Sequence, residues 1–272
     1  MFSLTLDSTP AELERLLAEL YECGTAGIIE EEVPGAGVRL RAFFGNDAAR
    51  PALVERFAAL APTWRSEPEV DWMSGWRDSW QPTSVGEKFF LVPVWSQEPT
   101  PAGRWRLEVD PGMAFGTGAH ATTQLCLEAL ERHLRPGDTV FDLGTGSGIL
   151  ARGAALAGAG RIYACDIEAD SAAVAHRTCR GRVHVFAGSL RSVRPGSVDL
   201  LLANINAETL CSMASDIAAA LRLGGRVIVS GFPPRHRDRI NHFFGQAGLT
   251  TLDENEKDGW VEMAFAAPTL KR

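Results

Sequence analysis

The sequence predicts an α/β protein: a small N-terminal α+β domain followed by a larger domain with a mostly parallel sheet. Three observations carry this prediction. Short elements over residues 2–70 follow the order β-α-β-β-α-β, the split pattern of a ferredoxin-like domain. From residue 88 onward, short apolar strands alternate with helical stretches, which is typical of a parallel sheet covered on both faces. Residues 249–267 instead predict an antiparallel hairpin around an Asp258-Gly259 turn.

The N-terminal elements each carry a local signal. Alternating polarity predicts the first strand, and a proline in the first turn with leucines on one face predicts the first helix. The segment Pro34-Gly35-Ala36-Gly37 predicts the turn of a hairpin. An amphipathic helix and a final strand complete the unit. The predicted elements are the strand 2–7, the helix 10–23, the strands 26–33 and 38–44, the helix 49–60 and the strand 63–70.

The segment "DWMSGWRDSWQP" begins at residue 71 and places Trp72, Trp76 and Trp80 four residues apart, on one face of a helix. This spacing predicts a linker helix that buries its tryptophans between domains. Tryptophans exposed for partner binding would need the same spacing, so this alternative stays open. The predicted layout is a small N-terminal domain over residues 1–67, a linker helix over 68–81 and a larger domain over 82–272.

The larger domain contains apolar runs short enough to be strands, with helical stretches between most of them. Helices are predicted over residues 147–158, 169–180 and 207–222. The predicted parallel strands are residues 139–143, 161–166, 182–188, 198–204 and 226–232.

Composition limits the function classes. The chain has 272 residues, 45% of them hydrophobic, and a net charge of −7, which argues against a broad nucleic-acid footprint. Its 5 cysteines lie far apart without a C-x-x-C motif, and its 6 histidines are dispersed, so we predict reduced thiols and no metal site. No signal peptide is apparent and no run of about 18 apolar residues occurs, so we expect a cytoplasmic protein without a membrane span.

A glycine cluster, "VFDLGTGSGIL", follows the strand 139–143 and opens a helix. Gly144, Gly146 and Gly148 allow the tight turn and bring helix N–H groups close to a ligand. The third glycine comes one residue earlier than in the dinucleotide motif, and Asp142 would repel a pyrophosphate. A carboxylate there suits a cationic ligand, so the spacing favours S-adenosylmethionine over a nicotinamide cofactor. A turn without any ligand is the remaining alternative.

Two further features bear on the cofactor. Asp166 ends the strand 161–166, where a carboxylate can accept hydrogen bonds from both ribose hydroxyls; an aspartate there can also cap a helix. The ribose is common to both candidate cofactors. The C-terminal antiparallel hairpin distinguishes them, because a seven-stranded Rossmann-like sheet with a reversed last strand is typical of class I S-adenosylmethionine-dependent methyltransferases.

The strand 198–204 ends in Asn204, at the sheet edge where ligands of such folds bind. Its amide oxygen can accept a hydrogen bond from a substrate amine while the amine keeps its lone pair free. Helix capping is the alternative role. The following Ile205, Asn206 and Ala207 supply neither proline nor an aromatic ring, which argues against a planar base or amide as acceptor.

The stretch "DPGMAFGTGAHATTQ", which begins at Asp110, forms a second glycine-rich segment. We expect it to cover the cofactor, with Phe115 as an apolar wall and with Thr122 and Thr123 offering hydroxyl and N–H groups at a helix start. A plain glycine-rich interdomain loop with a capped helix is the alternative.

The motifs "GMAFGTGAHATT", "DLGTGSGILA" and "ANINAETL", in this order behind a small N-terminal domain, resemble the PrmA family, which methylates protein eleven of the large ribosomal subunit. The resemblance covers essentially the whole chain. It implies that Thr123, Gly144, Asp166 and Asn204 match cofactor-binding positions, and that S-adenosylmethionine is the donor. It also implies trimethylation of lysine side chains and of the N-terminal amine, an N-terminal domain that docks the substrate, and a hinge that reorients the catalytic domain.

We therefore predict a monomeric S-adenosylmethionine-dependent protein N-methyltransferase in which Asn204 is the catalytic residue. Its predicted cofactor-binding residues are Phe115, Thr123, Gly144, Gly146, Asp166 and Asn204. We predict no dedicated general base, because a dry pocket lowers the pKa of the amine and proximity supplies much of the rate. A small-molecule amine N-methyltransferase and a non-catalytic ribosome-associated binding module are the alternatives.

Overall fold

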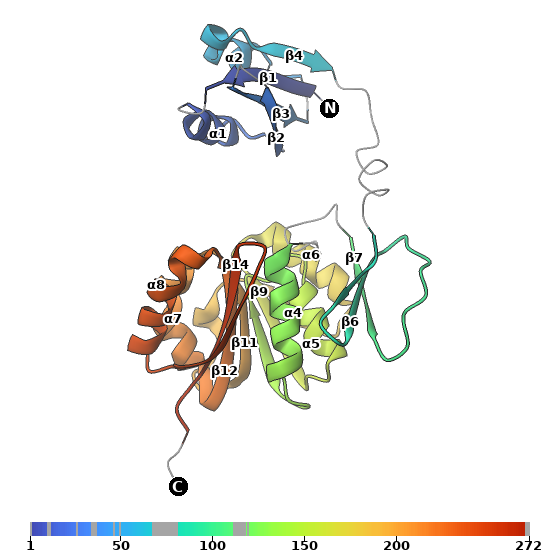
Figure 1. Cartoon of the computed structure of the whole chain (residues 1–272), viewed down its shortest axis with the longest axis vertical. Coiled ribbons are helices and arrows are strands. Elements are labelled where there is room, and N and C mark those ends of the chain that lie inside the picture. The colour runs from blue at the N-terminus through green and yellow to red at the C-terminus, as the bar shows by residue number, and fades with distance from the viewer. Residues whose placement is uncertain are drawn as a thin grey trace. The chain divides into compact units, whose positions relative to one another are not determined.

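The computed structural model describes residues 2–9, 12–25, 27–33, 37–45, 47–48, 50–66, 81–110, 118 and 120–269. The chain divides into two compact units, residues 1–79 and 80–272, and each is described by itself. Most of the helices and strands of both units are labelled in Figure 1. In the described residues, no helix is both long enough and apolar enough to cross a membrane.

The N-terminal unit packs helices against one antiparallel sheet with the strand order β2-β3-β1-β4. Its core is made of leucine and phenylalanine side chains, among them Leu4, Leu16, Leu40 and Phe57. These leucines alternate along the strands and recur every three or four residues along the helix, so one face of each element is buried. Its elements are β1 (Phe2–Ser8), α1 (Leu13–Glu22), β2 (Gly27–Val33), β3 (Gly37–Phe44), α2 (Arg50–Arg56), a 3-10 turn (Ala58–Leu60) and β4 (Thr63–Ser66).

The larger unit is built on a seven-stranded sheet with the order β10-β9-β8-β11-β12-β14-β13. The neighbours from β10 to β12 pair in parallel, whereas β14 runs antiparallel to both β12 and β13. Its strands are β8 (Thr139–Leu143), β9 (Arg161–Asp166), β10 (His184–Ala187), β11 (Val198–Asn204), β12 (Leu221–Phe232), β13 (Thr250–Lys257) and β14 (Trp260–Ala266).

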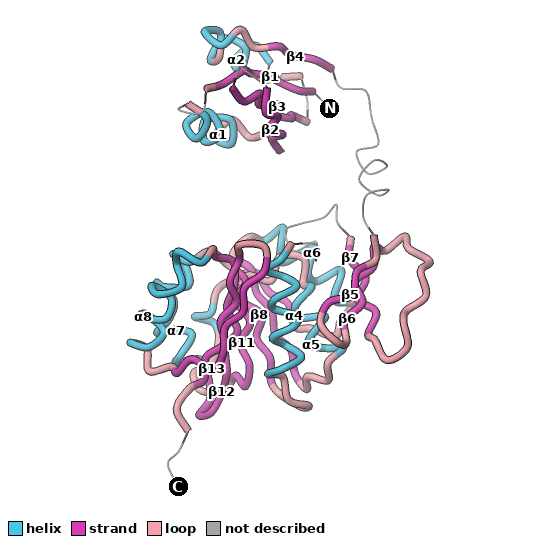
Figure 2. Tube along the Cα trace, in the orientation of Figure 1, coloured by secondary structure: helices cyan, strands magenta, loops and turns pink. Residues whose placement is uncertain are grey.

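Helices cover both faces of this sheet (Figures 1 and 2). One face packs against α7 and α8, and the other packs against α4 and α5. Successive residues of the central strands alternate between the two cores: Leu201 and Ala203 face α7, whereas Leu200 and Leu202 face α4. The helices are α4 (Ala121–His133), α5 (Ile149–Leu156), α6 (Ala169–Cys179), α7 (Ala207–Ala220) and α8 (Arg237–Gln246), with short 3-10 turns at Leu190–Ser192 and Pro234–His236.

A smaller three-stranded sheet precedes α4. Its strands are β5 (Thr83–Val85), β6 (Phe89–Pro93) and β7 (Trp105–Val109), with β5 antiparallel and β7 parallel to β6. Phe89, Leu91 and Leu107 join the core beneath α4 and α5. The sequence analysis predicted neither this sheet nor α8, because these strands are short and α8 carries few apolar residues on one face.

The predicted α/β class of the larger domain is confirmed. Most predicted elements lie within a few residues of their expected bounds, including the hairpins β2–β3 and β13–β14. The helix predicted over residues 49–60 instead ends at Arg56 and continues only as a 3-10 turn. The linker helix predicted over 68–81 lies almost wholly outside the described residues, and residue 81 is not helical.

Candidate active site

A cavity of about 530 Å³ opens at the carboxyl ends of β8 and β11, the sheet edge at which α/β proteins bind ligands. It lies wholly within the larger unit. Residues from the two central strands, from the start of α4 and from the β13–β14 hairpin meet there. Its lining includes His120, Thr122, Thr123, Asp142, Gly144, Thr145, Gly146, Ile149, Leu150, Asn204, Ile205, Asn206, Gly231 and Trp260.

The glycine loop after β8 forms one wall of the cavity. Gly144, Gly146 and Gly148 all have positive φ, at 70°, 53° and 80°, which L side chains rarely adopt. A Cβ atom on Gly144 would lie 2.5 Å from Cγ2 of Ile205, so the site also needs glycine for space. Gly148 is the N-cap of α5. The loop is therefore a cradle into which a ligand can approach the backbone closely.

Asp142 lies at the base of this cradle and is 1% exposed. Its Oδ2 accepts hydrogen bonds from Thr145 Oγ1 at 2.6 Å and from the Ala151 N–H at 3.2 Å. Burial raises the pKa of Asp142 to about 6, although the two hydrogen bonds lower it. The negative charge of Asp166 adds to the rise. The Asp142 carboxylate thus already binds the Ala151 N–H, a donor at the start of α5 that a pyrophosphate would need. Its negative charge favours a cationic ligand.

Asp166 ends β9 and is tied to the same loop. Its Oδ2 accepts from the Gly146 N–H at 2.9 Å, and its Oδ1 accepts from the Glu168 N–H at 3.1 Å. It is not among the described residues that line the cavity. Each carboxylate oxygen can accept a second hydrogen bond, so both remain able to bind hydroxyl groups.

Asn204 ends β11 and lines the cavity. Its Nδ2 donates to Thr122 Oγ1 at 3.1 Å. It does not cap the next helix: the N-cap of α7 is Asn206, whose side chain accepts from the Thr209 N–H at 2.9 Å. The capping alternative considered for Asn204 is therefore wrong, and the side chain serves the cavity.

The start of α4 supplies the opposite wall. Thr122 and Thr123 are 4% and 1% exposed, and both line the cavity. The N-cap of the helix is His120, whose Nδ1 accepts from the Thr122 N–H at 3.4 Å and lies 2.8 Å from Thr122 Oγ1. Of the second glycine segment, Gly118 is described: a Cβ there would lie 2.7 Å from Leu91 Cδ2, so this glycine packs into the fold. Phe115 lies outside the described residues.

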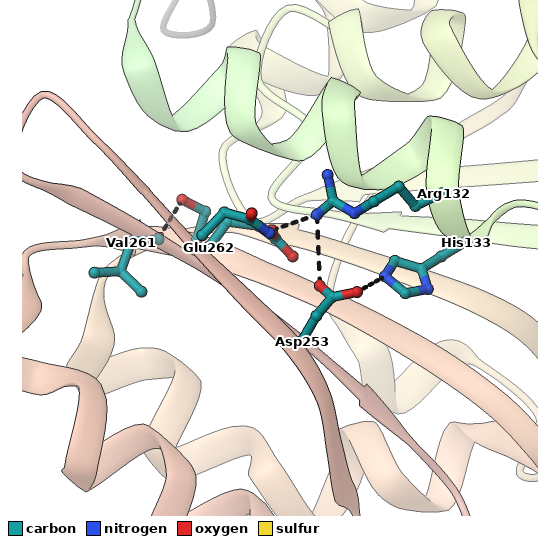
Figure 3. A network of polar contacts seen from close by, with 7 residues as sticks. Arg132, His133, Asp253, Val261 and Glu262 are labelled. Carbon is teal, nitrogen blue, oxygen red and sulfur yellow. Dashed lines mark hydrogen bonds and ion pairs between the residues drawn. The ribbon is translucent and has the colours of Figure 1, made fainter. Parts of the chain in front are cut away.

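Trp260, the first residue of β14, completes the described lining and meets the His120 ring edge-on, with centroids 4.7 Å apart. Polar contacts fasten its hairpin to α4 (Figure 3). Arg132 donates to Glu262 Oε2 at 2.9 Å, and His133 Nε2 lies 2.8 Å from Asp253 Oδ2. These contacts hold the strand that carries Trp260 against the helix that carries Thr122.

The structure thus brings Thr123, Gly144, Gly146 and Asn204 together around one cavity, with Asp166 bonded to its edge. The sequence analysis missed His120 and Trp260. His120 stands two residues before Thr122 in the second glycine segment, and Trp260 follows the predicted Asp258-Gly259 turn, but neither position alone indicates a ligand. In the described residues, no cluster of side chains could hold a metal ion.

Comparisons with known proteins agree with this geometry. A family model described as ribosomal protein L11 methyltransferase (PrmA) matches residues 3–268. A ribosomal protein L11 methyltransferase from Pelotomaculum thermopropionicum is 33% identical over 294 residues, which cover 94% of this chain and 96% of that protein. One from Geobacter metallireducens is 40% identical over 258 residues, covering 94% and 78%. A crystal structure of ribosomal protein L11 methylase from Lactobacillus delbrueckii subsp. bulgaricus superposes with a TM-score of 0.65 at 29% identity, covering 70% of this chain and all of that one.

Proposed function

The chain belongs to the ribosomal protein L11 methyltransferase (PrmA) family, and on that premise we propose that it methylates ribosomal protein L11 with S-adenosylmethionine as the methyl donor. The observation that supports the proposal is the cavity at the carboxyl ends of β8 and β11, which the glycine loop and the Asn204 side chain both line. S-adenosylmethionine supplies an electrophilic methyl group on a positively charged sulfur.

The residues around the cavity fit this cofactor. Gly144 and Gly148 leave little room for a Cβ atom, and the buried Asp142 offers the negative charge that a cationic ligand needs. We propose that Gly144, Gly146 and Thr123 line the bound cofactor, and that Asp166 accepts hydrogen bonds from its ribose hydroxyls. Asn204 would contact the bound cofactor at its reacting end. Phe115 stays a proposed apolar wall on the strength of the sequence alone.

We further propose that the acceptors are amines: lysine side chains and the N-terminal amine of the substrate, each trimethylated. An amine must be neutral to attack, and a free lysine has a pKa near ~10.4. Ile149, Ile205 and Trp260 give the cavity apolar walls that disfavour an ammonium and so lower its pKa. Asn204 can orient the amine through an N–H···O hydrogen bond, and much of the rate would come from proximity.

The N-terminal unit is proposed to be a ferredoxin-like domain that docks the protein substrate. Its four-stranded antiparallel sheet, with the strand order β2-β3-β1-β4, supports this fold. It has a hydrophobic core of its own, which supports a separate role. The proposed boundaries remain residues 1–67, 68–81 and 82–272. For the larger unit, the antiparallel β14 between β12 and β13 supports the reversed last strand of a class I methyltransferase.

The proposal also includes the location, the partners and the oligomeric state of the enzyme. A ribosomal substrate supports a cytoplasmic enzyme, and a net charge of −7 counts against a nucleic-acid partner. We propose a monomer, because the described cavity lies within one unit of one chain.

Mass spectrometry of purified ribosomal protein L11 tests the proposal. After incubation with the enzyme and isotopically labelled S-adenosylmethionine, labelled methyl groups are expected on lysines and on the N-terminal amine. Labelled methyl groups on other residue types would overturn the amine assignment. If L11 stays unlabelled while a small amine becomes labelled, the small-molecule alternative holds instead. If neither becomes labelled, although calorimetry detects cofactor binding, the catalytic proposal fails.

A further inference from the structure

We propose that Thr122, held by His120, is a positioning residue that turns the Asn204 amide so that its carbonyl oxygen faces the acceptor amine. This inference rests on the proposed function, because it assigns which end of the Asn204 amide faces the acceptor amine. It goes beyond cofactor binding by separating two adjacent threonines. Thr122 orients the side chain that binds the substrate, whereas Thr123 faces the cofactor.

The first step concerns the hydrogen bond that the His120 ring accepts. Its Nδ1 accepts a hydrogen bond from the Thr122 N–H at the start of α4, at 3.4 Å. A ring nitrogen that accepts carries no proton, so the ring's proton sits on Nε2. The ring packs against Trp260 in an edge-to-face arrangement, with 4.7 Å between the centroids and 67° between the planes.

The second step fixes the Thr122 hydroxyl. Its Oγ1 lies 2.8 Å from the same Nδ1. Since that nitrogen has no proton to give, the hydroxyl must donate to it. A hydroxyl has a single proton, so Oγ1 can only accept from any further partner.

The third step sets the orientation of Asn204. Its amide lies 3.1 Å from Thr122 Oγ1, and only the NH2 end can donate to an oxygen whose own proton is committed elsewhere. Flipping the amide would face two acceptors toward each other and would lose the hydrogen bond. The planar amide therefore holds Oδ1 on the side away from Thr122, and Asn204 itself lines the cavity.

The consequence concerns the class of acceptor. An oxygen presented to the substrate accepts a hydrogen bond from an amine N–H, and this leaves the nitrogen lone pair free to attack. The opposite orientation would present N–H groups, which suit an anionic or carbonyl acceptor instead. The arrangement thus selects amines as acceptors.

Matched variants of the two threonines test this assignment in steady-state kinetics. Thr122→Val removes the hydroxyl and keeps the shape of the side chain. It is expected to lower kcat on ribosomal protein L11 by about 10- to 100-fold, the effect of a lost positioning hydrogen bond. The Kd of S-adenosylmethionine should stay within about twofold. Thr122→Ser keeps the hydroxyl and should retain most of kcat, whereas Thr123→Val should instead weaken cofactor binding.

His120 provides a second pair of variants on an exposed side chain. His120→Asn retains an acceptor for the Thr122 N–H and hydroxyl and should keep most of kcat. His120→Phe keeps a ring against Trp260 but removes Nδ1, which frees the Thr122 proton and lets the amide flip. It should lower kcat in the same direction as Thr122→Val.

A readout that needs no turnover separates this inference from the proposed function. In 15N-labelled protein, the side-chain NH2 signal of Asn204 should show slow exchange with water for one proton, which is bonded to Thr122. Thr122→Val should abolish that protection and Thr123→Val should not. If the protection is present but L11 is never methylated, the proposed function fails and the orientation stands.

Three outcomes would overturn the inference. The first is an unchanged kcat in Thr122→Val. The second is a loss of cofactor affinity in Thr122→Val as large as in Thr123→Val, which would make Thr122 a cofactor ligand. The third is an Asn204 signal that is the same in wild type and Thr122→Val. A fall in melting temperature shared by Thr122→Val and Thr122→Ser would also count against it, as evidence of a purely structural role.

Discussion

The carboxylate of Asp166 accepts a hydrogen bond from the backbone N–H of Gly146, with an O···N distance of 2.9 Å. Its second oxygen binds the Glu168 N–H at 3.1 Å. The end of β9 therefore shapes the glycine loop that follows the neighbouring strand β8. Asp166, predicted as a ribose ligand with helix capping as the alternative, also holds the cradle in which the cofactor is expected to lie.

This double role makes Asp166→Ala a severe change for cofactor binding. The ribose hydroxyls would lose their charged acceptor, a loss of roughly 1.5–3 kcal/mol, and the loop would lose its tether. Asp166→Asn keeps a carbonyl oxygen for Gly146 and should fall between wild type and alanine. Isothermal titration calorimetry with S-adenosylmethionine measures both. Equal Kd values for all three proteins would refute the ribose assignment.

The turn at Gly144 should tolerate no side chain. Gly144→Ala combines a positive φ of 70° with a contact of 2.5 Å to Ile205. Gly158→Ala is the matched control: its φ is 94° and no atom would lie within 4 Å of the new Cβ. The control should cost about 1–2 kcal/mol of folding free energy through backbone strain alone. Gly144→Ala should lower the melting temperature further and weaken cofactor binding, which the control should leave intact. Equal effects of the two variants would show that Ile205 does not crowd the loop.

Much of this site could be predicted from the sequence, because its parts are local. A strand that runs directly into three spaced glycines and a helix fixes the cradle, and an asparagine at the end of a buried strand must lie at the ligand edge. Those inferences use only neighbouring residues and the rule that parallel strands end at one edge.

The rest could not be predicted because it depends on distant partners. Thr122 and Asn204 are 82 residues apart, and the pair forms only after α4 packs against β11. The adjacent hydroxyls of Thr122 and Thr123 look equivalent in the sequence, whereas in the fold Thr122 Oγ1 accepts a hydrogen bond from Asn204. Trp260 reaches the cavity only because β14 runs antiparallel beside β12.

Cofactor binding should weaken at acidic pH because of Asp142. Burial raises its pKa to about 6 in the free protein, and a cationic ligand should lower it again. The charged form is thus the one that binds, so affinity is nearly full at about pH 7 and is lost as the pH falls through 6. The expected change in Kd between pH 7 and pH 5 is about tenfold. Calorimetry across this range measures it, and Asp142→Asn should bind weakly at every pH with a flattened profile. A wild-type Kd that does not vary would contradict this role for the carboxylate.

Stability should depend on pH through Glu262, the fully buried carboxyl of the α4–hairpin network (Figure 3). Burial raises its pKa from 4.5 to about 7, although hydrogen bonds from Asn255 and Arg132 oppose the rise. A raised pKa means that the folded state holds the proton more tightly. The stabilisation is therefore complete below pH 4.5 and is lost as the pH rises toward and through 7.

Chemical denaturation between pH 5 and pH 8 measures this loss, which is expected to be of the order of 1–3 kcal/mol. His133 acts in the opposite sense, because burial lowers its pKa. Its contribution to the stability of the folded state is therefore lost as the pH falls. Glu262→Gln, which cannot ionise, isolates the glutamate and should flatten the decline between pH 5 and pH 8. A decline of the same size in this variant would assign it to another group.

The last prediction separates docking from chemistry. The chain divides into units 1–79 and 80–272, and the hydrophobic clusters that enclose the cavity belong to the second. A protein of residues 80–272 should therefore fold, show a cooperative thermal transition and bind S-adenosylmethionine with the Kd of the full chain. If the first unit docks the substrate, the shortened enzyme should lose most of its kcat/KM on ribosomal protein L11, mainly through KM. Its slow activity on a short lysine peptide should match that of the full chain, because such a peptide reaches the cavity without docking.

Full activity on L11 would show that the larger unit recognises the substrate by itself. Loss of activity on the peptide as well would mean that the first unit contributes to the reaction, and not only to docking.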